Sequence, residues 1–121
     1  MSLQSHSYIQ ASGLVTVDNS TASDDVIESE GAGTRLYIQY GYVIVTLAAT
    51  GGGGVVSLSD GSGGDTLFAV SGDAVGYYPI GFGETGYPLS IDTSLVLNTT
   101  SAATTQASAL CAFVGYYVGD L

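Results

Sequence analysis

The chain has 121 residues, which fits one domain. One Arg, no Lys and eleven acidic residues give a formal charge of −10, and only 10% of residues are charged against roughly 25% in an average globular chain. Binding to phosphate backbones or to anionic membrane surfaces needs clustered basic side chains, so we expect neither nucleic acid nor membrane as a partner.

The first 33 residues differ from the rest because they hold several acidic residues and no basic one. We expect residues 1–33 to form an extended N-terminal arm, with short strands near Leu14–Val17 and Val26–Glu28. No basic segment followed by an apolar run occurs near Met1, so we expect no secretory signal peptide. Residues 34–121 are expected to form the folded domain.

Strand patterns are clearer from Thr34 onward. Arg35–Ala49 predicts one long strand, or two joined at Gly41, followed by a loop of four glycines. Val55–Asp60 and Asp65–Val70 predict a hairpin, because a Ser-Gly turn separates two runs rich in β-branched and aromatic residues.

The remaining strands are shorter and are separated by Gly-containing turns. The predicted strands are Ala74–Ile80, Leu89–Ile91, Ser94–Thr99 and Ala107–Val118, with a Gly-rich loop at Gly81–Tyr87. No window shows a clean helical period. This pattern predicts an all-β fold, a two-sheet antiparallel β-sandwich, with a jelly roll as the preferred topology.

Two predicted strands are apolar on both faces, at Val43–Leu47 and Ala109–Tyr117. A two-layer sandwich covers only one face of each strand, so the other face would form an exposed apolar patch of the kind found at interfaces. We therefore expect a homo-oligomer. Barrel-like closure, or cover by the N-terminal arm, is the competing explanation.

Residues suited to catalysis are scarce. His6 is the only histidine, and Cys111, in an apolar run, is the only cysteine, so the chain lacks the several Cys and His that a zinc site requires. A nucleophilic triad needs a base, usually His, and His6 lies in the N-terminal arm next to Ser5 and Ser7, where we expect an exposed arm residue. We expect Cys111 to be a buried thiol and the protein to be a non-enzyme without a cofactor.

The one weak metal candidate is a calcium site at Asp60 and Asp65, which flank Gly-Ser-Gly-Gly. Calcium needs several oxygen ligands, and Asp and Gly also satisfy the geometry of a hairpin turn. We favour the turn and expect no metal.

The nine tyrosines are the most distinctive feature, and some are adjacent, as in Tyr77-Tyr78 and Tyr116-Tyr117. Adjacent strand residues face opposite sides, so one of each pair can fill the core while the other contacts a partner; core-edge packing is the alternative. The candidate interface residues are Tyr8, Ile9, Leu14, Val43, Val45, Tyr77, Phe113 and Tyr117.

A succession of segments between Thr34 and Gly119 carries a family resemblance. The segments are Arg35-Leu36-Tyr37-Ile38-Gln39-Tyr40, Val56-Ser57-Leu58-Ser59-Asp60-Gly61, Tyr78-Pro79-Ile80-Gly81-Phe82, Gly83-Glu84-Thr85-Gly86, Pro88-Leu89-Ser90-Ile91, Leu95-Val96-Leu97-Asn98, Ala102-Ala103 and Phe113-Val114-Gly115-Tyr116-Tyr117-Val118. In this order the chain resembles small jelly-roll proteins that decorate or cement the heads of tailed bacteriophages.

The resemblance implies a virion structural protein on the capsid surface, made in the host cytoplasm. Its partners would be the major capsid protein and copies of itself, with a trimer favoured. An arm of the kind expected at residues 1–33 often reaches the capsid in such proteins. The alternatives are a receptor- or carbohydrate-binding jelly roll, with exposed tyrosines around a groove near Gly81–Tyr87, or a vertex, fibre or tail component.

Overall fold

The computed structural model describes residues 10–100 and 105–120, without the side chains of residues 112, 113 and 120. These residues form strands joined by turns, and none of the described segments is a helix that could cross a membrane. The strands are β1 (Gln10–Ala11), β2 (Val15–Val17), β3 (Ser23–Ile27), β4 (Thr34–Leu47), β5 (Val55–Asp60), β6 (Thr66–Ser71), β7 (Gly76–Gly81), β8 (Tyr87–Pro88), β9 (Leu95–Thr100) and β10 (Ser108–Asp120).

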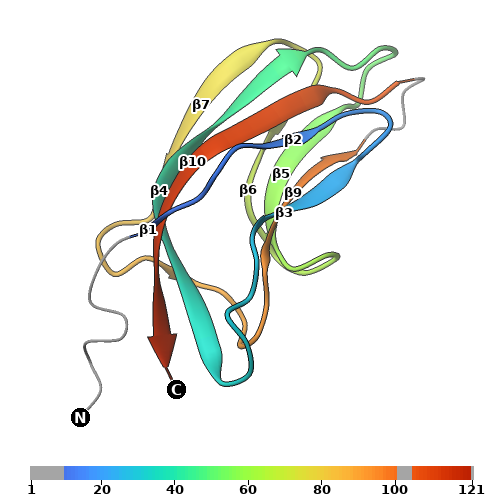
Figure 1. Ribbon diagram of the computed structural model, residues 1–121. Coiled ribbons are helices and arrows are strands. Elements are labelled where there is room, and N and C mark those ends of the chain that lie inside the picture. Colours follow the sequence, from blue (N-terminus) through green and yellow to red (C-terminus); the bar gives the residue numbers. More distant parts are fainter. Residues whose placement is uncertain (1–9, 101–104, 121) are drawn as a thin grey trace.

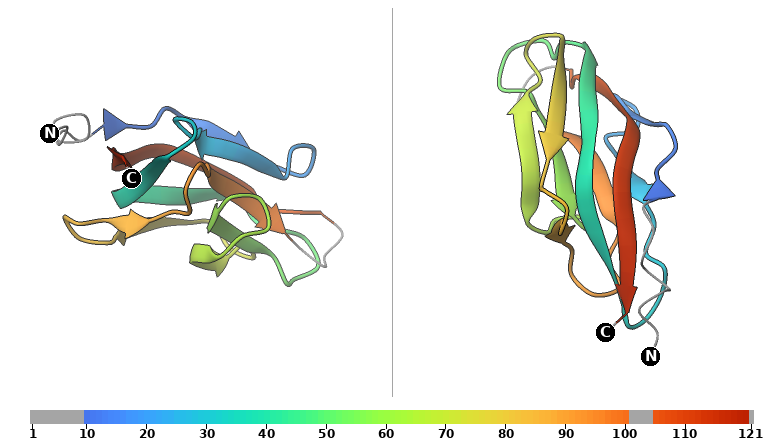
Figure 2. Two further views of the ribbon diagram at one scale, coloured as in Figure 1. Left: turned by 90° about the horizontal axis from the view of Figure 1, so that it is seen from below. Right: turned by 90° about the vertical axis from the view of Figure 1, so that its left-hand side faces the viewer.

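The strands build two antiparallel sheets that pack face to face (Figures 1 and 2). In the larger sheet, β1 and β2 follow one another along one edge of β10, β10 pairs with β4, and β7 and β8 lie along the far edge of β4. The smaller sheet has the order β3-β9-β5-β6. Most successive strands belong to different sheets. The exceptions are the β5–β6 hairpin and the two edges at which a pair of short strands lies on one neighbour, β1 with β2 and β7 with β8. This order of strands is a jelly-roll arrangement. The two-sheet antiparallel sandwich is confirmed.

The core between the sheets is made of aliphatic side chains, since these strands are rich in Val, Ile and Leu at alternate positions. The first 33 residues contribute to it through Val17, Val26 and Ile27, which are buried. β2 pairs with β10 and β3 pairs with β9. The division of the chain at 33/34 is therefore not a boundary of the sandwich, because residues 10–27 supply edge strands to both sheets.

Strand β4 changes the face it presents to the core partway along its length. Before the change, the even-numbered Leu36 and Ile38 point inward, and after it the odd-numbered Val43 and Val45 do. A regular strand would keep even-numbered residues on one face throughout. A register shift opposite Gly115/Tyr116 leaves Gln39 as an extra residue in β4, and such a bulge resets the alternation.

The bulge also determines which residues of β4 point into the core after Gln39. Val43 and Val45 are fully buried, so their prediction as interface residues is wrong. Tyr42 and Ile44, which alternate with them, point away from the core.

Strand β10 has a matching irregularity between Leu110 and Phe113. Ala109 and Cys111 face the core before it, and Val114 faces the core after it. Cys111 is buried, as expected from its apolar neighbours.

Most predicted strands are present, with shifted ends, but the strand expected at Leu89–Ile91 is wrong. The chain pairs with β4 at Tyr87–Pro88 instead, and Leu89 N–H then donates to Leu36 O at 2.9 Å. The segment ends in a turn where Asp92 has a φ of 57°, so it cannot continue as a strand.

Candidate interaction surface

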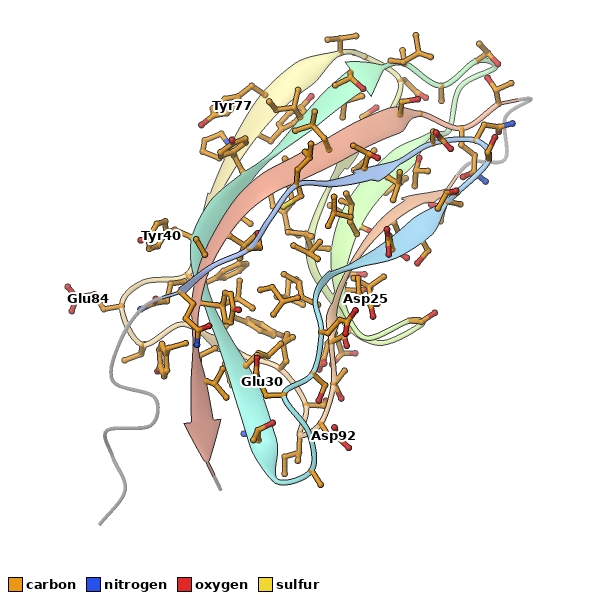
Figure 3. The ribbon with its side chains drawn as sticks, viewed as in Figure 1. Asp25, Glu30, Tyr40, Tyr77, Glu84 and Asp92 are labelled. Carbon is orange, nitrogen blue, oxygen red and sulfur yellow. The ribbon has the colours of Figure 1, made fainter. Side chains whose placement is uncertain are left out.

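The outer face of the larger sheet is covered by tyrosines and aliphatic side chains. The alternation set by the bulges brings together Tyr37, Tyr40, Tyr42, Ile44, Tyr77, Pro79, Leu110 and Tyr117, which we call the tyrosine face. Tyr40 and Tyr77 project from this side of the sheet in Figure 3. They are 44% and 60% exposed, so the face is open to solvent.

Contacts between neighbouring strands hold several of these rings in place. The Tyr37 and Tyr117 rings stack with centroids 4.7 Å apart, and Tyr42 and Tyr77 form a tilted pair at 5.4 Å. The Tyr40 ring lies over Gly115, where an added Cβ would come within 2.7 Å of Tyr40 Cζ. A glycine beneath an aromatic ring lets the ring lie close to the sheet.

Hydrogen bonding fixes the end of the face near β8. The Tyr117 hydroxyl donates to Thr85 O at 2.7 Å. Burial, with a smaller contribution from the nearby Tyr37, raises the pKa of Tyr117 above its ordinary value. Burial, with a smaller contribution from Glu30, likewise raises the pKa of Tyr116 on the inner face. Both hydroxyls therefore stay neutral at physiological pH.

Charge is distributed unevenly around the molecule. Asp25, Glu30 and Asp92 lie toward the opposite side from Tyr40 and Tyr77 (Figure 3). Of the described side chains, those of the tyrosine face include no carboxylate. Two charged residues lie close to this face: Arg35 shares the outer side of β4 with Tyr37, and Glu84 lies on the same side of the molecule as Tyr40 (Figure 3). A chain of net charge −10 thus presents one broad face made of tyrosine and apolar side chains.

A pocket of about 380 Å³ lies at the rim of the tyrosine face, lined by Gln39, Tyr40, Gly81, Gly83 and Glu84. Gln39 Nε2 donates to Glu84 O at 2.7 Å, and Gln39 O accepts from Phe82 N–H at 2.7 Å, so the bulge holds the β7–β8 loop. Gln39 is buried, and its Oε1 has no hydrogen-bond partner within the described part of the chain.

The outer face of the smaller sheet is different in character. It carries a depression of about 300 Å³ lined by small and mostly polar residues, namely Val55, Ser57, Ser59, Gly63, Gly64, Thr66, Ala69, Asn98 and Thr100. Asn98 Nδ2 donates to Ser59 Oγ at 2.9 Å. This surface has no aromatic side chain among its lining residues.

Asp60 and Asp65, the weak calcium candidates, flank the turn of the β5–β6 hairpin and make hydrogen bonds within the protein. Both Asp60 carboxylate oxygens accept from Ser90 N–H at 3.0 Å, and one accepts from Ser90 Oγ at 2.7 Å. Asp65 contributes its main-chain oxygen to Asp60 N–H at 2.8 Å. Across residues 10–100 and 105–120, no three His, Cys, Asp or Glu side chains gather as a metal site would require.

The other predicted interface residues have mixed outcomes. Leu14 is 64% exposed, and Tyr77 and Tyr117 belong to the tyrosine face. Tyr8, Ile9 and the Phe113 side chain lie outside the described residues. The sequence-based prediction of interface residues did not include Tyr40 or Glu84. Regular alternation would place Tyr37 and Tyr40 on opposite faces of β4, and the bulge at Gln39 puts them on the same face.

Comparison with known proteins adds no identity, since no protein-family model matches the chain and no curated protein is significantly similar to it.

Proposed function

We propose that this protein is a virion structural protein, a subunit that decorates or cements a phage capsid by binding coat subunits and further copies of itself. A trimer is the favoured assembly, and the activity is binding alone. The observation that carries the proposal is the tyrosine face, whose own side chains include no carboxylate, on a strongly acidic protein.

Electrostatics favours this face as the contact surface. Two copies that each carry a charge of −10 repel one another wherever carboxylates meet. Contact through the tyrosine face keeps the carboxylates of Asp25 and Asp92 away from the partner (Figure 3). Interface cores are enriched in Tyr and depleted in Asp, Glu and Lys, which is the composition of this face.

The rigidity of the face also supports binding. The Tyr37–Tyr117 and Tyr42–Tyr77 ring pairs restrict these side chains before any partner arrives. Less conformational entropy is then lost on association. On a capsid, many modest contacts made at once would stabilise the shell through avidity.

The jelly-roll order of the strands is the fold that the resemblance to head decoration proteins implies. The same fold serves many other binding proteins, so it supports the proposal without identifying the partner.

Reattachment to particles tests the proposal. Purified full-length protein is added to phage particles produced without it, and the bound fraction is measured after sedimentation. We expect Tyr77→Glu on β7 to reduce binding strongly, because it places a carboxylate on the tyrosine face. Ala69→Glu on β6 adds the same charge to the exposed outer side of the other sheet and should leave binding unchanged. Equal loss in both variants, or attachment that survives Tyr77→Glu, would contradict the proposal.

A further inference from the structure

The pocket at the rim of the tyrosine face offers hydrogen-bond acceptors and an aromatic ring. Glu84 is exposed on the β7–β8 loop and supplies a carboxylate. Tyr40 is 44% exposed and supplies a ring whose position is set by Gly115. Figure 3 shows Tyr40 and Glu84 on the same side of the molecule.

The side-chain amide of Gln39 adds a second hydrogen-bond acceptor to the pocket, beside the Glu84 carboxylate. Its Nε2 donates to Glu84 O, whereas its Oε1 has no hydrogen-bond partner among residues 10–100 and 105–120, and Gln39 is only 6% exposed. A buried acceptor without a partner costs free energy that a donor from a ligand can recover. A ligand rich in donors is therefore favoured over one that brings acceptors.

A cationic ligand fits these groups best. A guanidinium carries five donors and no acceptor, stacks on aromatic rings and pairs with carboxylates. The net charge of −10 attracts cations to the protein from a distance. A neutral saccharide also stacks on aromatic rings, but it would gain nothing from this charge.

The cation must come from another molecule. The chain has no Lys, and its one Arg, Arg35, is half-buried near the start of β4. A second copy of the chain therefore offers no exposed basic side chain among the described residues.

We infer that the pocket formed by Gln39, Tyr40, Gly81, Gly83 and Glu84 binds an arginine side chain of a partner protein. The guanidinium stacks on Tyr40, pairs with the Glu84 carboxylate and donates to Gln39 Oε1 after a small movement of the loop. The inference goes beyond the proposed function, because it concerns the pocket whether or not the partner is a coat protein.

The test is an NMR titration of the isotope-labelled full-length protein with N-acetylarginine amide. N-acetylcitrulline amide, which has nearly the same shape but no charge, is the matched probe, and ionic strength is held constant. We expect saturable shifts of the Tyr40 ring and of the Gly81–Glu84 amides with the arginine probe only. Because exposed ion pairs contribute little, the dissociation constant should be on the order of millimolar or weaker.

Two variants assign the binding to the pocket. Glu84→Gln should weaken binding roughly two- to fivefold, the ratio expected for loss of an exposed ion pair. Glu28→Gln removes the same charge from an exposed residue after β3 and should change binding little. Tyr40→Leu should also weaken it. Equal response to both probes, shifts outside the pocket, equal effects of the two glutamate variants, or binding of methyl glucoside in place of the arginine probe would overturn the inference.

Discussion

The Tyr37 and Tyr117 rings stack almost parallel, with centroids 4.7 Å apart and 4° between their planes. The two residues face each other directly in the β4–β10 register. The Tyr117 hydroxyl also reaches Thr85 O, and the Tyr37 ring covers Gly119. One ring pair thus joins both central strands to the β7–β8 loop, at the end where β4 and β10 extend beyond the smaller sheet (Figure 1).

Loss of this stack should destabilise the fold. Tyr37→Ala removes the ring pair and uncovers Gly119, and we expect the free energy of unfolding to fall by about 1–3 kcal/mol in urea denaturation. Tyr77→Ala is the control, since Tyr77 is 60% exposed and only tilted against Tyr42. Tyr77→Ala should lower the free energy of unfolding by less than Tyr37→Ala does. An equal or larger loss in Tyr77→Ala would show that the Tyr37–Tyr117 stack does not stabilise the fold more than an exposed tyrosine does.

Stability should decline at alkaline pH. The pKa values of Tyr116 and Tyr117 are raised in the folded protein, mainly by burial. As pH rises past about 10, the unfolded chain loses these protons first, so the free energy of unfolding falls. Tyr117→Phe should remove part of this decline between pH 9 and pH 11, measured by urea denaturation. The same decline in the variant and in the natural sequence would contradict the assignment.

The inward orientation of Val43 can be tested against its outward neighbour. Val43→Ala empties a fully buried site and should lower the free energy of unfolding by about 2 kcal/mol. Ile44→Ala removes a larger side chain from the outer face, yet it should cost less because Ile44 is only half-buried. The reverse order would mean that β4 lacks the bulge at Gln39.

Removal of residues 1–33 should unfold the protein. The deletion takes away β1, β2 and β3 and with them the buried Val17, Val26 and Ile27. We expect the truncated chain to lose its cooperative thermal transition, followed by circular dichroism. A truncated protein that still unfolds in a cooperative transition would contradict this prediction. It would mean that residues 34–121 fold independently and that residues 1–33 are a separate arm.

The sandwich could be predicted from the alternation of apolar and polar residues and from the Gly-containing turns, because both depend on residues close together in the sequence. The β5–β6 hairpin was predicted at Val55–Asp60 because a Gly-rich turn separates two β-prone runs, and the burial of Cys111 followed from its apolar neighbours. These features depend on few distant contacts.

The tyrosine face could not be predicted in full, because it depends on tertiary pairing. The extra residue Gln39 is held by Phe82 and Glu84, far away in the sequence. Without that bulge, Tyr37 and Tyr40 lie on opposite faces and the alternation of β4 misplaces Val43. The strand predicted at Leu89–Ile91 failed for a similar reason, since Leu36 and Thr34 set the path of that segment.

The copy number of this chain in purified particles tests the central claim most directly. It is measured by quantitative mass spectrometry against the major coat protein of the same particles. A capsid decoration or cement subunit predicts a ratio of the same order as the coat protein. A few copies per particle would indicate a vertex, fibre or tail component instead, and absence from particles would contradict the proposed function.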